Sequence, residues 1–74
     1  MTRTKMNKLA SQLKTMYLTE NPVNYDDNWY GCKYFICFHN THKIAKGFSN
    51  IPDTVEFLSD VIENGFSVDG ATFF

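Results

Sequence analysis

The fold of this chain is decided by the stretch Trp29–His39, which reads Trp-Tyr-Gly-Cys-Lys-Tyr-Phe-Ile-Cys-Phe-His. It contains five aromatic rings and both cysteines of the chain, and no helix-breaking residue follows Gly31. Aromatic, β-branched and small side chains fit the pleated, largely buried surface of a sheet. We therefore predict that Trp29–His39 is the central strand of a β-sheet.

The alternation of side chains along a strand divides this stretch into two faces. The face that we expect the helices to cover carries Tyr30, Cys32, Tyr34, Ile36 and Phe38. The other face carries Trp29, Lys33, Phe35, Cys37 and His39, and its lysine and histidine predict a partly solvated surface.

A short connection leads from this stretch to a second strand, so that residues 29–48 are expected to form a β-hairpin. Lys43 and Lys46 make the second strand amphipathic and favour an edge position, where lysines discourage the addition of further strands.

The segment before the hairpin predicts an amphipathic helix over residues 4–19. Its apolar residues run at helical spacing from Met6 to Tyr17, and Asn21-Pro22 stops it because the residue before proline avoids the helical region. Residues 20–28 are rich in Asn, Asp and Pro and predict a loop.

The segment after the hairpin predicts a second helix over residues 51–64. Pro52 suits the first turn, Asp53 and Glu56 form a capping-box pattern, and Gly65 is placed to end the helix. Residues 66–74 then run extended, either as one bent strand or as a small hairpin turning at Asp69-Gly70.

The predicted fold class is therefore α+β, in the order α-β-β-α-β. The 74 residues suffice for one small domain spanning residues 1–74. We expect an antiparallel sheet of three or four strands with both helices mainly on one face.

The charges are unevenly distributed along the chain. The charged residues before Glu20 are all basic, and those after Ser49 are all acidic. Either the two ends neutralise each other in the fold, or each end faces a different partner. Since the net charge is only -1, overall charge gives no reason to expect a nucleic-acid partner.

The cysteines and the apolar runs indicate a cytoplasmic protein. Cys32 and Cys37 are expected on opposite faces of one strand, where they are badly oriented for a disulfide. Two free thiols fit a reducing compartment. We expect no signal peptide, because the basic N-terminus lacks an apolar stretch, and no membrane span, because the apolar runs are too short.

Cys32, Cys37, His39 and His42 are candidate ligands of a zinc ion, and Cys37 with a histidine is a candidate nucleophile and base. Zinc sites draw ligand pairs from separate segments, and a nucleophile needs an orienting group and an oxyanion site. Neither pattern is present, so we predict no enzyme activity, no metal and no cofactor.

Aromatic residues next to charged ones are typical anchors of protein interfaces. We therefore predict a small non-enzymatic modulator or inhibitor that binds a protein partner, either as a monomer or as a homodimer. The candidate partner-binding residues are Trp29, Lys33, Phe35, His39, Asp53, Glu56, Asp60 and Glu63. The acidic residues among them suggest a mimic of phosphates that engages a basic surface.

Two further expectations accompany this prediction. Six lysines against one arginine suggest an AT-rich genome, which with the small size fits a phage or mobile-element accessory protein acting in a host cytoplasm. The alternative function is nucleic-acid binding through an open sheet face beside the basic N-terminal helix. There the rings of Trp29 and Phe35, next to Lys33, would stack on bases.

Overall fold

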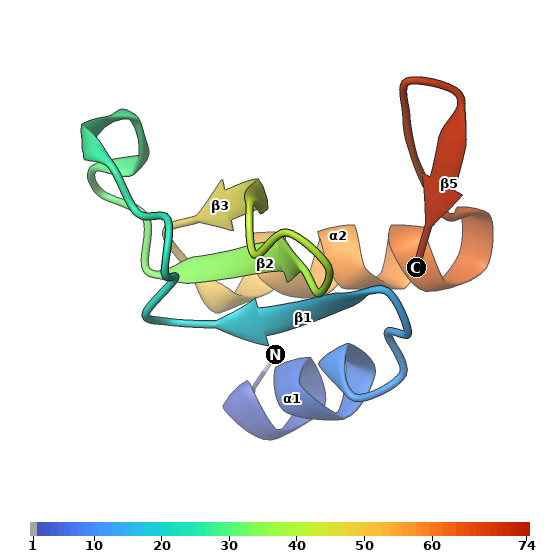
Figure 1. Ribbon diagram of the computed structural model, residues 1–74. Coiled ribbons are helices and arrows are strands. Elements are labelled where there is room, and N and C mark those ends of the chain that lie inside the picture. The colour runs from blue at the N-terminus through green and yellow to red at the C-terminus, as the bar shows by residue number, and fades with distance from the viewer. Residues whose placement is uncertain (1) are drawn as a thin grey trace.

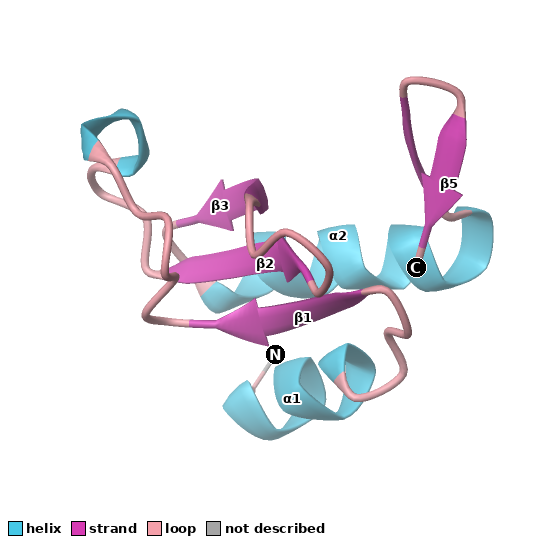
Figure 2. Cartoon of the chain, viewed as in Figure 1, coloured by secondary structure: helices cyan, strands magenta, loops and turns pink. Residues whose placement is uncertain are grey.

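The computed structural model describes residues 2–74. Two α-helices pack with a three-stranded antiparallel sheet, and a separate two-stranded hairpin follows (Figures 1 and 2). The elements are α1 (Arg3–Ala10), β1 (Met16–Thr19), the 3₁₀ turn η1 (Asp27–Trp29), β2 (Tyr34–Phe38), β3 (Ile44–Phe48), α2 (Ile51–Asn64), β4 (Phe66–Val68) and β5 (Ala71–Phe73). The predicted α+β class is confirmed, and the predicted elements appear in the predicted order.

β2 is the central strand of the sheet, whose order is β1-β2-β3. Both helices cover the same face of this sheet, as predicted. The buried core there consists of Met6 from α1, Met16 from β1, Tyr34 and Ile36 from β2, and Val55, Leu58 and Val61 from α2. Phe38 packs at the margin of this core, so the predicted helix-covered face is correct from Tyr34 to Phe38.

The prediction of one helix over 4–19 is wrong, because α1 ends at Ala10 and β1 begins at Met16. β2 is buried on both faces, so its main-chain groups need hydrogen-bond partners along both edges. β1 supplies one set, with Tyr17 opposite Cys37 and Thr19 opposite Phe35. In the sequence, a strand at residues 16–19 is indicated by the alternation of more and less apolar residues. The same residues also fit helical spacing, so the sequence alone does not distinguish the two.

The prediction that β2 begins at Trp29 is also wrong, because Trp29, Tyr30 and Cys32 donate local hydrogen bonds within residues 26–32. Asp26 accepts from the backbone N–H of Asn28, and the Trp29 N–H donates to the Asp26 carbonyl at 3.1 Å. This cap starts the single turn of η1. Tyr30 is consequently 88 % exposed and does not reach the helix-covered face.

α2 has the predicted bounds, but its cap lies earlier than the predicted Asp53–Glu56 pair. Asn50 is the N-cap: its Oδ1 accepts from the backbone N–H of Asp53 at 2.9 Å, and its Nδ2 donates to the Asp53 carboxylate at 3.0 Å. This reciprocal pair of hydrogen bonds satisfies the main-chain N–H of Asp53 in the first turn of the helix. Glu56 is thereby left on the solvent side of the helix.

The C-terminal segment forms its own hairpin, β4–β5, and does not join the main sheet as a third strand. Positive φ angles at Asp69 (50°) and Gly70 (81°) fit the tight turn between the two strands. The hairpin stands beyond the end of α2 (Figure 1). It is tied down by the Phe74 carbonyl, which accepts from Lys14 N–H at 2.8 Å and from the Thr15 hydroxyl at 2.8 Å.

Gly65 joins α2 to this hairpin, and a substitution at this position tests how closely the hairpin packs against the end of α2. Its φ of 79° with ψ of 167° is a region open essentially to glycine, and a Cβ there would collide with Thr72 Cγ2. Gly65→Ala and the control Gly70→Ala should each lose roughly 1–3 kcal/mol to backbone strain, with Gly65→Ala losing more.

Urea denaturation measures this difference in the free energy of unfolding. Adding Thr72→Ser, which removes Cγ2 but keeps the hydroxyl, should recover the additional loss in Gly65→Ala. Equal losses for the two glycine variants would contradict a close contact between α2 and the hairpin.

Candidate functional site

The predicted surface formed by Trp29, Lys33, Phe35 and His39 is dispersed by the fold. Phe35 is only 2 % exposed, Trp29 is half-buried in η1, Lys33 is exposed before β2, and His39 is exposed in the turn after β2. These four side chains therefore do not form one surface.

The reason is that the loop between β1 and β2 covers the second face of the sheet. The Tyr25 ring meets Phe35 edge-on at 5.9 Å, and Asn24 Nδ2 donates to the His42 carbonyl at 2.8 Å. The Trp29 ring lies over β3, where a Cβ added at Gly47 would come within 2.9 Å of it. The prediction of a partly solvated second face is therefore wrong at its centre.

This arrangement takes Phe35 out of the stacking surface that the nucleic-acid alternative expects. Bases stack on exposed aromatic rings, whereas the Phe35 ring is enclosed between the sheet and Tyr25. The exposed aromatic residues of the loop are instead Tyr25 and Tyr30.

The predicted acidic residues, in contrast, lie together on the solvent side of α2. Asp53, Glu56, Asp60 and Glu63 are three or four residues apart, which aligns them on one helix face, and all four are exposed. We call these four residues the acidic face. Within residues 2–74, the one ion pair joins Arg3 to Glu20, so no direct ion pair neutralises the acidic face.

An aromatic floor borders the acidic face. Phe57 from α2 and Phe48 from β3 are half-buried, and their ring centroids lie 5.3 Å apart. Together with Ser59 and the acidic face they line an open groove of about 600 Å³. Carboxylates around an apolar floor form a surface that attracts cationic groups and offers area for an apolar contact. The sequence reasoning identified the carboxylates but missed the floor, which only the packing of β3 on α2 creates.

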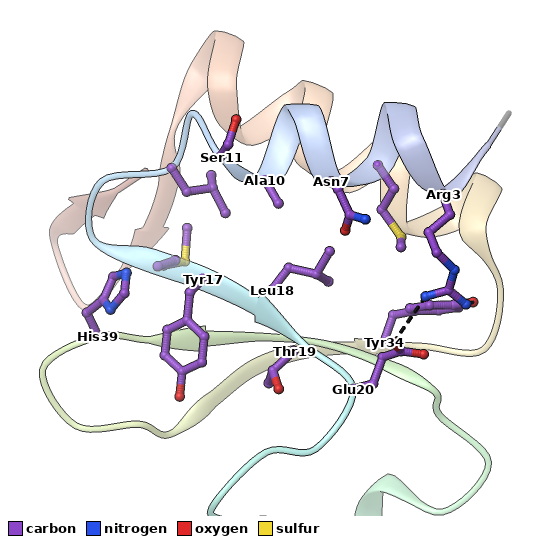
Figure 3. A pocket seen from close by; sticks show the side chains of 13 residues that line it. Arg3, Asn7, Ala10, Ser11, Tyr17, Leu18, Thr19, Glu20, Tyr34 and His39 are labelled. Atoms are coloured by element: carbon purple, nitrogen blue, oxygen red, sulfur yellow. Dashed lines mark hydrogen bonds and ion pairs between the residues drawn. The ribbon is translucent and has the colours of Figure 1, made fainter.

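A second groove separates α1 from β1 (Figure 3). It has a volume of about 510 Å³ and is lined on one side by α1 and on the other by Met16–Thr19. Arg3 closes one end: its Nη1 pairs with Glu20 at 3.0 Å and its Nη2 donates to the Tyr34 hydroxyl at 3.2 Å. Ser11 and His39 lie at the other end (Figure 3). The sequence does not predict this groove, because residues 16–19 also match helical spacing.

Cys37, His39 and His42 gather around Tyr17 on the second face. The Tyr17 hydroxyl lies 2.9 Å from His42 Nδ1, and its ring packs on His39 at 4.8 Å. Burial raises the pKa of the adjacent Cys37 thiol, and Tyr17 lowers it by less. Burial also raises the pKa of Tyr17, with a further contribution from Cys37. The thiol is thus kept protonated, which is the opposite of what an activated nucleophile needs.

The metal hypothesis finds no ligand set in the described part of the chain. Within residues 2–74, no three His, Cys, Asp or Glu side chains are grouped closely enough to hold an ion. Cys37 is fully buried below Tyr17, whereas Cys32 is half-buried next to Gly47. Both thiols are free.

Comparisons of this chain with protein-family models, with curated proteins and with solved structures gave no match. Across residues 2–74, neither helix has the length and apolar character needed to cross a membrane. The acidic face with its aromatic floor is therefore chosen as the candidate site on its geometry alone.

The buried thiol predicts a specific dependence of stability on pH. The pKa of Cys37 is higher in the folded chain than its unfolded value of about 8.5. The unfolded state therefore loses this proton first as the pH rises. The resulting stabilisation is complete below the unfolded pKa and is lost as the pH rises through the folded pKa.

The urea midpoint of the unmodified chain should be lower at pH 10 than at pH 7. In Cys37→Ala the midpoint should fall less between these two pH values. Cys32→Ala is the matched control, because Cys32 is less buried, and it should keep the full alkaline loss. An equal alkaline loss in all three proteins would show that Cys37 does not carry the effect.

Proposed function

We propose that this chain is a small non-enzymatic protein that binds another protein through the acidic face of α2 and modulates or inhibits it by occupying its surface. The observation that carries this proposal is the alignment of four exposed carboxylates over an aromatic floor, with none of the four in an ion pair among residues 2–74. A row of like charges disfavours the isolated fold and is relieved by a cationic partner.

The spacing of the carboxylates favours a partner that binds nucleic acid. With a rise of about 1.5 Å per residue, carboxylates three or four residues apart are separated by roughly 4.5–6 Å along the helix. Phosphates of one DNA strand follow one another every 3.4 Å or so along the helix axis. The acidic face thus presents a charge density of the same order as a nucleic-acid strand, and it would compete for the basic surface of such a protein.

The aromatic floor adds the apolar component of an interface. Aromatic rings that become buried inside a charged rim usually supply much of the binding energy between two proteins. Electrostatic contacts contribute more to the association rate and to specificity. Phe48 and Phe57 therefore supply most of the binding energy, and the acidic face speeds association and selects the partner. The small size and the excess of lysine over arginine fit an accessory protein of a phage or mobile element that meets its target in the host cytoplasm.

Reversing two of these charges tests the proposal. In Asp60→Lys/Glu63→Lys, affinity for the captured partner should fall at least tenfold, which corresponds to about 1.4 kcal/mol of binding free energy. The matched control, Asp26→Lys/Asp27→Lys, makes the same change in net charge on the loop that covers the other sheet face, and its affinity should stay within twofold.

The partner is obtained by pull-down of the tagged chain from its native cell lysate, divided into nuclease-treated and untreated halves. A stoichiometric protein band that survives nuclease and is lost with the Asp60/Glu63 variant is the expected result. A band unaffected by the reversal would refute the acidic face as the site. A signal that disappears with nuclease would favour the nucleic-acid alternative.

A further inference from the structure

The groove beside α2 has an apolar floor and a rim of a single charge. Its lining consists of the aromatic floor, Ser59 and the acidic face, and none of these residues is basic. The charge along the groove is therefore entirely negative, while aromatic rings form its base. A ligand that is complementary to both features carries positive charge and also packs against an aromatic ring.

The Phe57 ring is held in place by two other aromatic rings. Its centroid lies 5.3 Å from that of Phe48 and 5.5 Å from that of Phe66, which it meets edge-on. Phe57 is nevertheless only half-buried, and it lines the groove. A ring that is fixed by its neighbours and still partly exposed is a pre-formed surface for a flat cation.

Carboxylates lie next to this ring on the preceding and the following turn of α2. Asp53 precedes Phe57 by four residues and Asp60 follows it by three, so the three side chains are neighbours on the helix surface. Both carboxylates are also oriented by an amide. Asn50 Nδ2 donates to Asp53 at 3.0 Å. Asn64 Nδ2 donates to Asp60 at 3.0 Å. Each carboxylate keeps further lone pairs that can accept hydrogen bonds from a ligand.

The carboxylates of the acidic face do not converge on one point. Within residues 2–74, no three acidic, histidine or cysteine side chains are grouped closely enough to hold a metal ion. Asp53 and Glu63 are instead separated by about 15 Å along the helix. This surface suits several cationic groups spaced along a chain. An extended segment rises roughly 3.3 Å per residue, so cations at alternate positions lie about 6.6 Å apart, close to the roughly 4.5–6 Å between carboxylates.

We propose that this groove binds an extended, arginine-rich segment of the partner protein, with one guanidinium stacked on Phe57 and paired with the carboxylates of Asp53 and Asp60. This inference rests on the proposed function and names the chemistry that the partner presents. Arginine is favoured over lysine because a guanidinium is flat and more weakly hydrated than an ammonium, so it stacks on aromatic rings. A guanidinium also donates two parallel hydrogen bonds to one carboxylate.

The test uses the full chain and two fluorescein-labelled peptides of equal length and charge. One peptide alternates glycine with arginine, and the other alternates glycine with lysine. Fluorescence anisotropy at neutral pH and constant ionic strength measures the affinity of each peptide. The arginine peptide should bind about three- to fivefold more tightly than the lysine peptide, which is the effect expected of one cation–π contact at a partly exposed ring.

Phe57→Leu removes the ring from the groove and keeps an apolar side chain. The preference for the arginine peptide should then disappear, while the affinity for the lysine peptide should change less than twofold. Phe38→Leu is the matched control, because it makes the same change in a ring that also contacts Phe66 but lies outside the groove, and it should keep the preference. Thermal melting establishes that both variants are folded. If Phe57→Leu is not, the ring-proton NMR signals of Phe57 in the unmodified chain decide the question, since they should shift more with the arginine peptide.

Equal binding of the two peptides to the unmodified chain would overturn the proposal, as would an arginine preference that Phe57→Leu retains. Either result leaves the proposed function intact, provided that Asp60→Lys/Glu63→Lys weakens the binding of both peptides. If neither peptide binds, or if the charge reversal weakens neither, the acidic face is not a site for cationic partners. The arginine inference and the proposed function then fail together.

Discussion

The burial of one five-residue strand on both faces is the constraint on which the rest of the structure depends. Tyr34 and Ile36 pack under the two helices, while Phe35 and Cys37 are buried on the other side. A strand buried in this way has no water to satisfy its main chain, so it needs neighbours along both edges. β1 and β3 satisfy that need, and the loop over Phe35 closes the second face. A domain of 74 residues thus places a two-layer core around a single strand.

The same constraint limits which surfaces stay exposed. Since both faces of the sheet are occupied, the largest exposed groups lie on the outer side of α2 and on the projecting loop. The acidic face follows from the amphipathic pattern of α2, whose inner side supplies Val55, Leu58 and Val61 to the core. The basic residues of the N-terminal end, Arg3, Lys5, Lys8 and Lys14, are carried by α1 and the segment after it. The two charged ends of the chain are therefore displayed on separate elements, and among residues 2–74 no ion pair joins them, since the one ion pair links Arg3 to Glu20.

Part of this organisation was predictable because local rules agreed with the fold. The bounds of α2 follow from its apolar period, from Pro52 and from Gly65, and the exposure of its four acids follows from the same period. The helix-covered face from Tyr34 to Phe38 follows from strand alternation. The errors lie where two patterns overlapped. Met16 fits both a helical stripe and a strand, and Trp29 has strand propensity but follows a strong cap at Asp26.

The sequence by itself determined the α+β class, the central strand, the helix α2 and the row of carboxylates along it, because each depends on residues close together in the chain. Only the tertiary structure decided that residues 16–19 become a strand, that the loop buries Phe35, and that Phe48 lies beside Phe57 below the acidic face. These outcomes depend on hydrogen bonds and contacts between distant segments. A buried main-chain N–H or C=O group needs a hydrogen-bond partner, and it bonds to whichever segment the fold places beside it. Local propensity does not predict which segment that is.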